Sequence, residues 1–309
     1  MTTNEFYPEG YRMDTPRNRA AVATPAALYE AMAAGEVLEG RAIRCDGAHN
    51  LYVELPCGEG ILPREEGALG IAEGTTRDIA LISRVSKPVC FTVQSIREEK
   101  GRVRATLSRR AAQQRCRTQY LDRLQPGEVI PARVTRLESF GVFCDVGCGL
   151  PALIPIAALS VSRISHPADR LAVGDRIYGA VTLNQEGRIC LSCRELLGTW
   201  EENAALFNPG DTVAGVVRSV EEYGIFVELT PNLAGLAEWR EGIRPGRRAG
   251  VYVKSILPAR MKVKLVIIDT QDPTPAPPTP LQFFITGGRL DRWRYSPPGC
   301  DKLVETVFR

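Results

Sequence analysis

The sequence SFGVF at residues 139–143 decides the fold, because it places a glycine between two aromatic residues inside an apolar stretch. Upstream, PGEVI at 126–130 is a turn followed by apolar residues. Downstream, GDRI at 174–177 and GRICLS at 187–192 have the same form. These motifs follow the order of elements in a five-stranded barrel: a strand, a glycine-interrupted strand, a third strand, a short helix and two more strands. We therefore predict one such barrel at residues 126–194.

The same plan recurs on either side of this barrel. EYGIF at 222–226 fills the aromatic slot of a copy at 209–269, and HNLYVEL at 49–55 marks a degenerate copy at 35–110 that lacks the glycine and one aromatic. Repetition at a fixed plan indicates tandem units. The predicted fold is mostly β, with three tandem five-stranded barrels joined by short helices and followed by a C-terminal extension.

Short helices and extended segments are predicted outside the barrels. Residues 1–34 form an N-terminal extension that is extended and poorly ordered to residue 23 and then helical, with Thr24 as its cap. Residues 111–125 and 195–208 are helical linkers, the second carrying one apolar stripe. Residues 270–309 are a proline-rich spacer and a tail too short to bury its own core, so the tail packs on a barrel or docks on a partner.

Composition restricts the partners and the compartment. The net charge is +3, from 39 basic and 36 acidic residues, so any nucleic-acid site must be a local patch. The nine cysteines are an odd number, the N-terminus shows no signal-peptide pattern, and no apolar run reaches the length of a membrane span. These features predict a cytoplasmic protein with free thiols and no membrane partner.

Aromatic and basic residues fall in matching places of the repeats. Aromatic rings on an open sheet give nucleobases a stacking surface, and nearby basic residues hold phosphates. A lone aromatic is usually a core residue, but an aromatic pair around glycine that recurs 83 residues later favours RNA contact. The predicted RNA-binding residues are Phe140, Phe143 and Arg188 in the second repeat, Tyr223, Phe226, Lys262 and Lys264 in the third, and Tyr52 and Arg104 in the first.

FGVFCDV at 140–146 and YGIFVEL at 223–229 resemble the second strand of the S1 RNA-binding domain, and GRICLS resembles its last strand. The order of repeats is similar to that of the multi-repeat ribosomal S1 proteins. The resemblance implies OB-fold barrels that bind single-stranded RNA, most simply mRNA, at the ribosome or in translation. Many family members place a histidine twelve residues after the second aromatic, where this chain has Pro63, Pro155 and Glu238.

Two other functions fit parts of the sequence. A protein-docking scaffold on the ribosome or RNA polymerase, with weak RNA contact, agrees with the small net charge, the degenerate first repeat and the aromatic tail. An RNA-processing enzyme is disfavoured, because no catalytic domain remains once the barrels are assigned and no phosphate-loop or metalloprotease motif occurs. Cys144, Cys148, Cys190 and Cys193 have only a superficial zinc spacing. We expect no catalytic residues, no metal and no cofactor.

Overall fold

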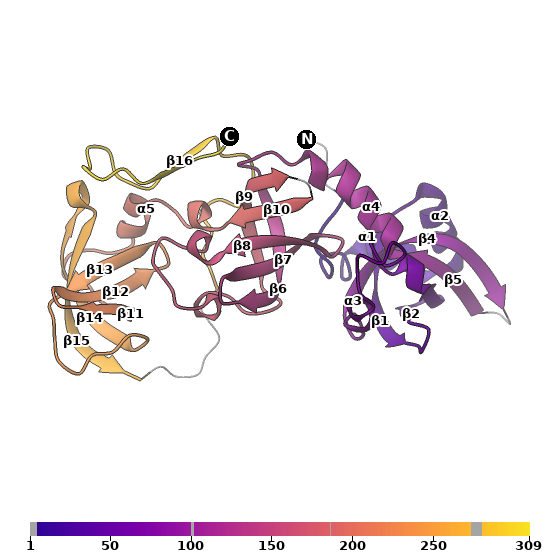
Figure 1. Cartoon of the computed structure of the whole chain (residues 1–309), viewed down its shortest axis with the longest axis horizontal. Coiled ribbons are helices and arrows are strands. Elements are labelled where there is room, and N and C mark those ends of the chain that lie inside the picture. Colours follow the sequence, from indigo (N-terminus) through magenta and orange to yellow (C-terminus); the bar gives the residue numbers. More distant parts are fainter. Residues whose placement is uncertain (1–4, 100–101, 186, 273–279) are drawn as a thin grey trace. The chain divides into compact units, whose positions relative to one another are not determined.

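The computed structural model describes residues 5–99, 102–185, 187–272 and 280–309. It contains three closed five-stranded barrels (Figure 1), which confirms the predicted mostly-β fold. Two compact units make up the chain. Unit 1 comprises residues 1–124 and 145–151, and unit 2 comprises residues 125–144 and 152–309.

Each barrel has the same strand order, in which the first strand pairs with the second and fourth and the third strand pairs with the fifth. The third–fifth pairing is parallel and closes the barrel, as in an OB fold. Barrel 1 contains β1 (Leu38–Cys45), β2 (Leu51–Leu55), β3 (Gly58–Leu62), β4 (Pro88–Glu99) and β5 (Arg102–Ser108). Barrel 2 contains β6 (Val129–Glu138), β7 (Gly141–Gly147), β8 (Leu150–Pro155), β9 (Arg176–Gln185) and β10 (Arg188–Ser192). Barrel 3 contains β11 (Thr212–Glu221), β12 (Gly224–Thr230), β13 (Leu233–Ala237), β14 (Arg248–Leu257) and β15 (Lys262–Gln271).

Short helices lie before, within and between the barrels. The α-helices are α1 (Pro16–Ala23), α2 (Pro25–Ala34), α3 (Ile79–Ile82), α4 (Arg109–Gln119) and α5 (Trp200–Ala204). The 3-10 turns are η1 (Arg64–Glu66), η2 (Leu121–Arg123), η3 (Ile156–Ala158), η4 (Pro167–Asp169), η5 (Arg194–Leu196) and η6 (Pro258–Arg260). Among the described helices, none is long and apolar enough to cross a bilayer.

The second linker is not the continuous helix that its apolar stripe predicts. Gly198 adopts a φ of +82°, a left-handed conformation that ends the turn of η5. Thr199 then starts α5 with a capping box, in which its side chain accepts the Glu202 N–H and the Glu202 carboxylate accepts the Thr199 N–H. The stripe is therefore divided between two short segments.

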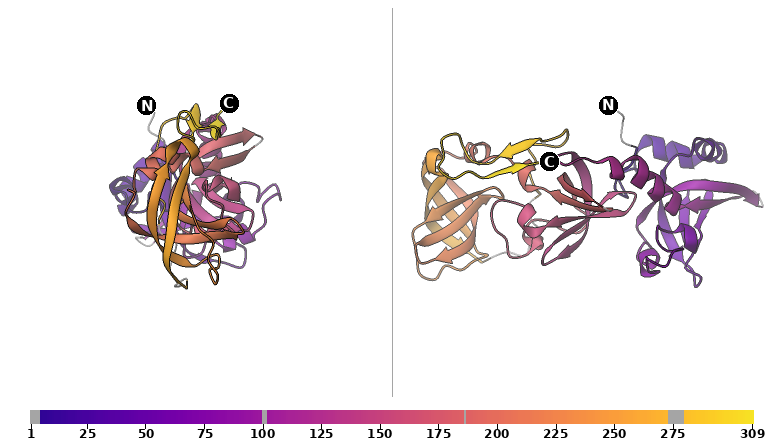
Figure 2. Two further views of the ribbon diagram at one scale, coloured as in Figure 1. Left: turned by 90° about the vertical axis from the view of Figure 1, so that its left-hand side faces the viewer. Right: turned by 45° about the horizontal axis from the view of Figure 1, so that its top comes forward.

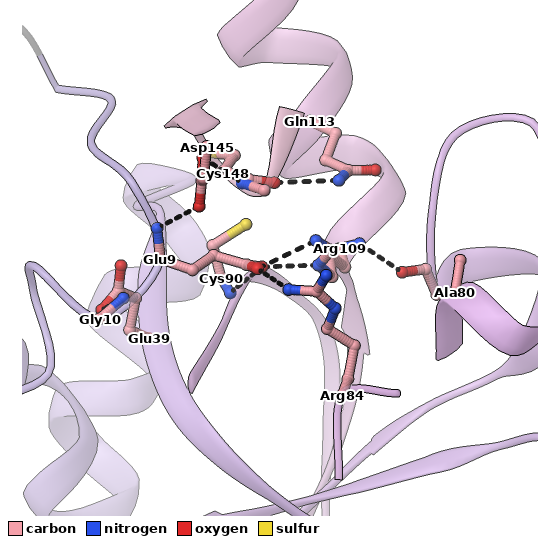
Figure 3. Close-up of polar contacts among 12 residues, drawn as sticks. Glu9, Gly10, Glu39, Ala80, Arg84, Cys90, Arg109, Gln113, Asp145 and Cys148 are labelled. Carbon is pink, nitrogen blue, oxygen red and sulfur yellow. Dashed lines mark hydrogen bonds and ion pairs between the residues drawn. The ribbon is translucent and has the colours of Figure 1, made fainter. Parts of the chain in front are cut away.

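The prediction that residues 1–23 are extended and poorly ordered is wrong for the described part. The Thr15 side chain caps α1 by accepting the Asn18 N–H, and Pro16 suits the first helical position. Within unit 1 the carboxylate of Glu9 is buried and accepts from Arg109 Nε at 2.6 Å and from Arg84 Nη1 at 3.0 Å (Figure 3). These partners lie far away in sequence, so no local pattern could reveal them.

Two more buried carboxylates hold this N-terminal segment. Glu39 accepts the backbone N–H groups of Gly10, Arg12 and Met13, each at 3.0 Å. Asp145 accepts the N–H of Glu9 at 2.7 Å (Figure 3). Burial raises the pKa of Glu39 to about 7 and also raises the pKa of Asp145. For Glu9, burial alone would raise the pKa, but the Arg109 and Arg84 guanidinium groups outweigh it and lower that pKa.

In unit 2 the C-terminal tail packs back on the barrels, which settles the alternative that the sequence left open. The tail contains β16 (Arg292–Arg294) and β17 (Glu305–Val307), and Figure 2 shows this yellow segment beside the barrels of unit 2. Trp293, Tyr295 and Phe308 are buried. The Tyr295 hydroxyl donates to Asn232 O at 2.6 Å. The tail therefore contributes aromatic side chains to the hydrophobic cores of barrels 2 and 3.

Candidate nucleic-acid interface

A row of outward-facing residues crosses barrel 3 from strand to strand, and we call it the stacking row. Phe226 on β12 pairs with Leu236 on β13, which in turn pairs with Lys264 on β15. The row is completed by Ser219 on β11 and Ser255 on β14. Because neighbouring strands lie about 4.8 Å apart, Lys264 is roughly 10 Å from Phe226 along the row.

The aromatic pair of barrel 3 consists of Phe226, a member of this row, and Tyr223, three residues earlier in the chain. Tyr223 precedes β12 and is 70% exposed, whereas Phe226 is half-buried. Their ring centroids are 6.0 Å apart, and the ring planes are nearly perpendicular at 85°. The exposed Tyr223 ring offers a flat apolar surface, and its edge-to-face contact with Phe226 fixes the pair.

Barrel 2 carries the same arrangement. Phe140 is 55% exposed and Phe143 is half-buried, with centroids 6.0 Å apart and planes at 90°. The row continues through Leu153 on β8, which pairs with Cys190 on β10. Cys190 therefore occupies the position that Lys264 has in barrel 3. Arg188 lies two residues before Cys190, at the position of Lys262, and is exposed.

The glycine between the aromatics has a steric role. A Cβ atom on Gly141 would come within 2.4 Å of Ile154 O, and one on Gly224 within 2.6 Å of Ala237 O. The third strand thus crosses the second so closely that only glycine fits. In barrel 1 this position is Asn50, whose side-chain oxygen accepts the Arg64 N–H at 3.1 Å.

Two arginines in the rows were not found from the sequence. The Arg136 guanidinium lies 4.5 Å from the centre of the Phe143 ring, and that of Arg44 lies 3.6 Å from the centre of the Tyr52 ring. Both are exposed residues of the first strand of their barrel. In the sequence, each of these arginines stands seven or eight positions before the second aromatic residue. This spacing predicts contact with the ring only when the register of the hairpin is known. In barrel 3 the corresponding residue is Ser219.

Barrel 1 brings carboxylates to its aromatic slot. The Tyr52 hydroxyl donates to Asp46 at 3.2 Å, while Arg44 covers its ring. His49, in the first aromatic position, has Nδ1 3.2 Å from an Asp78 oxygen, and Arg64 Nε donates to the same carboxylate at 2.8 Å. Hydrogen bonds from Asn50 lower the pKa of Asp46, so this carboxylate carries its charge at neutral pH. Such a surface disfavours phosphate.

The predicted basic residues are distributed unequally over the barrels. Lys262 and Lys264 are both exposed on β15, and neither forms an ion pair with any described residue. Arg104 is exposed on β5, where it pairs in register with Arg97 on β4 and Glu59 on β3. Barrel 3 therefore combines the exposed aromatic pair with uncommitted positive charge, while barrel 1 does not.

The fold and the aromatic pairs define this chain as a protein of tandem OB barrels. One of its barrels matches a known family. Residues 123–194, which include all of barrel 2, match the model described as "S1 RNA binding domain". The chain thus carries an S1 domain at barrel 2, and barrels 1 and 3 share the strand order of that barrel.

Two relatives similar in sequence are ribosomal proteins. The "Small ribosomal subunit protein bS1" of Leuconostoc lactis is 32% identical over 190 residues, covering 56% of this chain and 44% of that protein. The bS1 protein of Rhizobium meliloti (strain 1021) is 27% identical over 220 residues, covering 68% of this chain and 38% of that protein. The chain thus spans less than half the length of these relatives. A solved multidomain protein with nucleic-acid-binding domains from Streptococcus pneumoniae shares 17% identity over 76% of this chain and 74% of that chain, with a TM-score of 0.25.

Proposed function

We propose that this chain binds single-stranded RNA, and mRNA in particular, on barrels 2 and 3, in translation at the ribosome and therefore in the cytoplasm. The observation that carries the proposal is the recurrence of one exposed aromatic pair at the same place on two barrels. Phe140 and Tyr223 are 55% and 70% exposed, so both rings are available for stacking without unfolding any core. The S1 match of barrel 2 and the ribosomal relatives support the same function.

The roles within the interface follow from position. Phe140, Phe143, Tyr223 and Phe226 would stack on bases, which tolerates any sequence. Arg188, Lys262 and Lys264 would contact phosphates beside them. Tyr52 and Arg104 of barrel 1 would contribute less, because Arg44 covers the Tyr52 ring and the Tyr52 hydroxyl is bonded to the Asp46 carboxylate. We infer a binding role rather than a catalytic one, so RNA incubated with the protein and Mg²⁺ should stay intact.

The exposed ring of each pair gives a direct test. Phe140→Ala and Tyr223→Ala should each weaken binding of a single-stranded oligonucleotide by about 1–3 kcal/mol in an anisotropy titration. Both side chains are exposed, so the barrels should keep their melting temperature. Tyr29→Ala is the matched control, because Tyr29 is an aromatic residue of α2 that is 41% exposed. Unchanged affinity in both variants would refute this site.

Barrel 1 favours a second candidate function, docking of a protein such as a ribosomal or RNA polymerase subunit. Its aromatic slot is lined by Asp46 and Asp78, and α3 next to Asp78 exposes Ile79 by 63% and Ile82 by 43%. Apolar side chains beside paired charges suit a protein surface better than a polyanion. A partner captured by the wild type and lost with Ile79→Asp, while RNA affinity is unchanged, would support docking by this barrel.

A further inference from the structure

Trp239 is the exposed tryptophan of barrel 3, and none of the contacts described above uses it. It is 56% exposed, whereas Trp200 and Trp293 are 2% and 5% exposed. A tryptophan ring is the largest apolar side chain, and an exposed ring can stack on a nucleobase. The position of Trp239 in the repeat shows which residues lie near it.

The other two barrels show which residue this position neighbours. In barrel 2 the corresponding residue is Ile156, whose N–H donates to the carbonyl of Phe140, the exposed aromatic, at 2.9 Å. In barrel 1 it is Arg64, whose Nε bonds the Asp78 carboxylate that also contacts His49, the residue in the first aromatic position. The position therefore lies beside the first aromatic slot in both barrels.

The register of barrel 3 gives the same result. Ile225 pairs with Ala237, and a Cβ on Gly224 would lie 2.6 Å from Ala237 O. Tyr223 and Trp239 are each two residues beyond this pair, so they leave the β12–β13 ladder at the same end. Arg240 Nη1 then reaches the carbonyls of Ile267 and Ile268, both at 3.4 Å, which holds this segment against β15.

We propose that Trp239 is a third base-stacking residue of barrel 3, next to Tyr223 and Phe226. The inference rests on the proposed function, because it names a further contact for the same single-stranded RNA. Glu238, exposed just before it, offers no stacking surface and repels phosphate. The indole ring of Trp239, one residue later, provides a flat apolar surface at the Tyr223 end of the β12–β13 ladder, and tryptophan stacks on any base.

Tryptophan fluorescence can test the proposal directly in the full chain. The probe is a uridine oligonucleotide of about 15 nucleotides, near the upper limit of the site size of one OB barrel. Since Trp200 and Trp293 are buried, acrylamide should quench mainly Trp239, and bound RNA should protect it. Trp239→Ala should weaken binding roughly 5- to 150-fold, the range expected for loss of one stacked base, whereas Trp239→Phe should keep most of the affinity.

The controls separate failure of the inference from failure of the proposed function. Bound RNA that leaves Trp239 open to acrylamide, with Trp239→Ala binding as the wild type does, would overturn the inference and leave RNA binding intact. A wild-type chain that does not bind the oligonucleotide at all would overturn both. Tyr29→Ala should change neither readout, and an unaltered melting temperature of Trp239→Ala shows that a loss of affinity is not a loss of fold.

Discussion

Removal of the two β15 lysines should change the salt dependence of RNA binding by a calculable amount. The proposal assigns three phosphate contacts, to Arg188, Lys262 and Lys264, all exposed. Single strands lose about 0.7 in the logarithm of affinity per contact for each tenfold rise in salt, so the wild-type slope should be about −2. A rise from about 50 to about 200 mM salt should then weaken binding roughly 18-fold.

The variant that carries both Lys262→Ala and Lys264→Ala retains one of the three contacts. Its slope should be about −0.7, and the same rise in salt should weaken binding only about 2.6-fold. Anisotropy titrations at four or more salt concentrations would give both slopes. Both side chains are exposed and without a described ion pair, so we expect little change in the free energy of unfolding.

The matched control removes two exposed lysines from outside the stacking row, Lys87→Ala with Lys302→Ala. It lowers the net charge equally, so it separates a local phosphate contact from a general effect of charge. Equal slopes in the wild type and the β15 variant would refute the assignment of these lysines. If the slope of the control variant becomes as shallow as that of the β15 variant, net charge rather than the stacking row sets the salt dependence.

Two predictions concern the scaffold of unit 1. Arg109→Met should lower the free energy of unfolding by about 3–5 kcal/mol in urea titrations, because the buried Glu9 carboxylate loses its main cationic partner. The control Arg110→Met removes an exposed ion pair and should lower the free energy of unfolding by under about 1 kcal/mol. Glu39→Gln should reduce the pH dependence of stability. Since the folded pKa of Glu39 is about 7, above its unfolded value, Glu39 favours the folded state below pH 4.5 and loses that advantage as the pH rises to 7, a change of about 3 kcal/mol at most.

The sequence was sufficient for the barrels because their signals are local. Alternation in RVRATLS at 102–108 places Val103, Ala105 and Leu107 on one face of the strand, and all three are buried. The glycine-flanked aromatics marked the second strand of barrels 2 and 3 correctly. Each of these inferences requires only neighbours within one strand or one turn.

Features that depend on distant partners were missed. The order of residues 5–23 depends in part on Glu9, whose partner Arg109 is 100 positions away. The stacking of Arg136 on Phe143 requires the register of a hairpin, which the residue types alone leave open. The division of the second linker at Gly198 was also missed. A glycine inside a helical pattern can either continue or end the helix, and Gly198 ends it.

The two ends of β12 in barrel 3 differ in how open the outer face is to solvent. Glu228 follows Phe226 on the same face of β12, but it is only 6% exposed because Arg170 and Arg218 pair with its two carboxylate oxygens. Packing within unit 2 thus closes the face on that side, since a strand of RNA could enter only by breaking a buried ion pair. At the opposite end Tyr223 and Trp239 remain exposed, and nothing in the described part of the chain covers them. We therefore expect single-stranded RNA to reach this face of barrel 3 past Tyr223 and Trp239, in the direction of Lys264, rather than past Glu228.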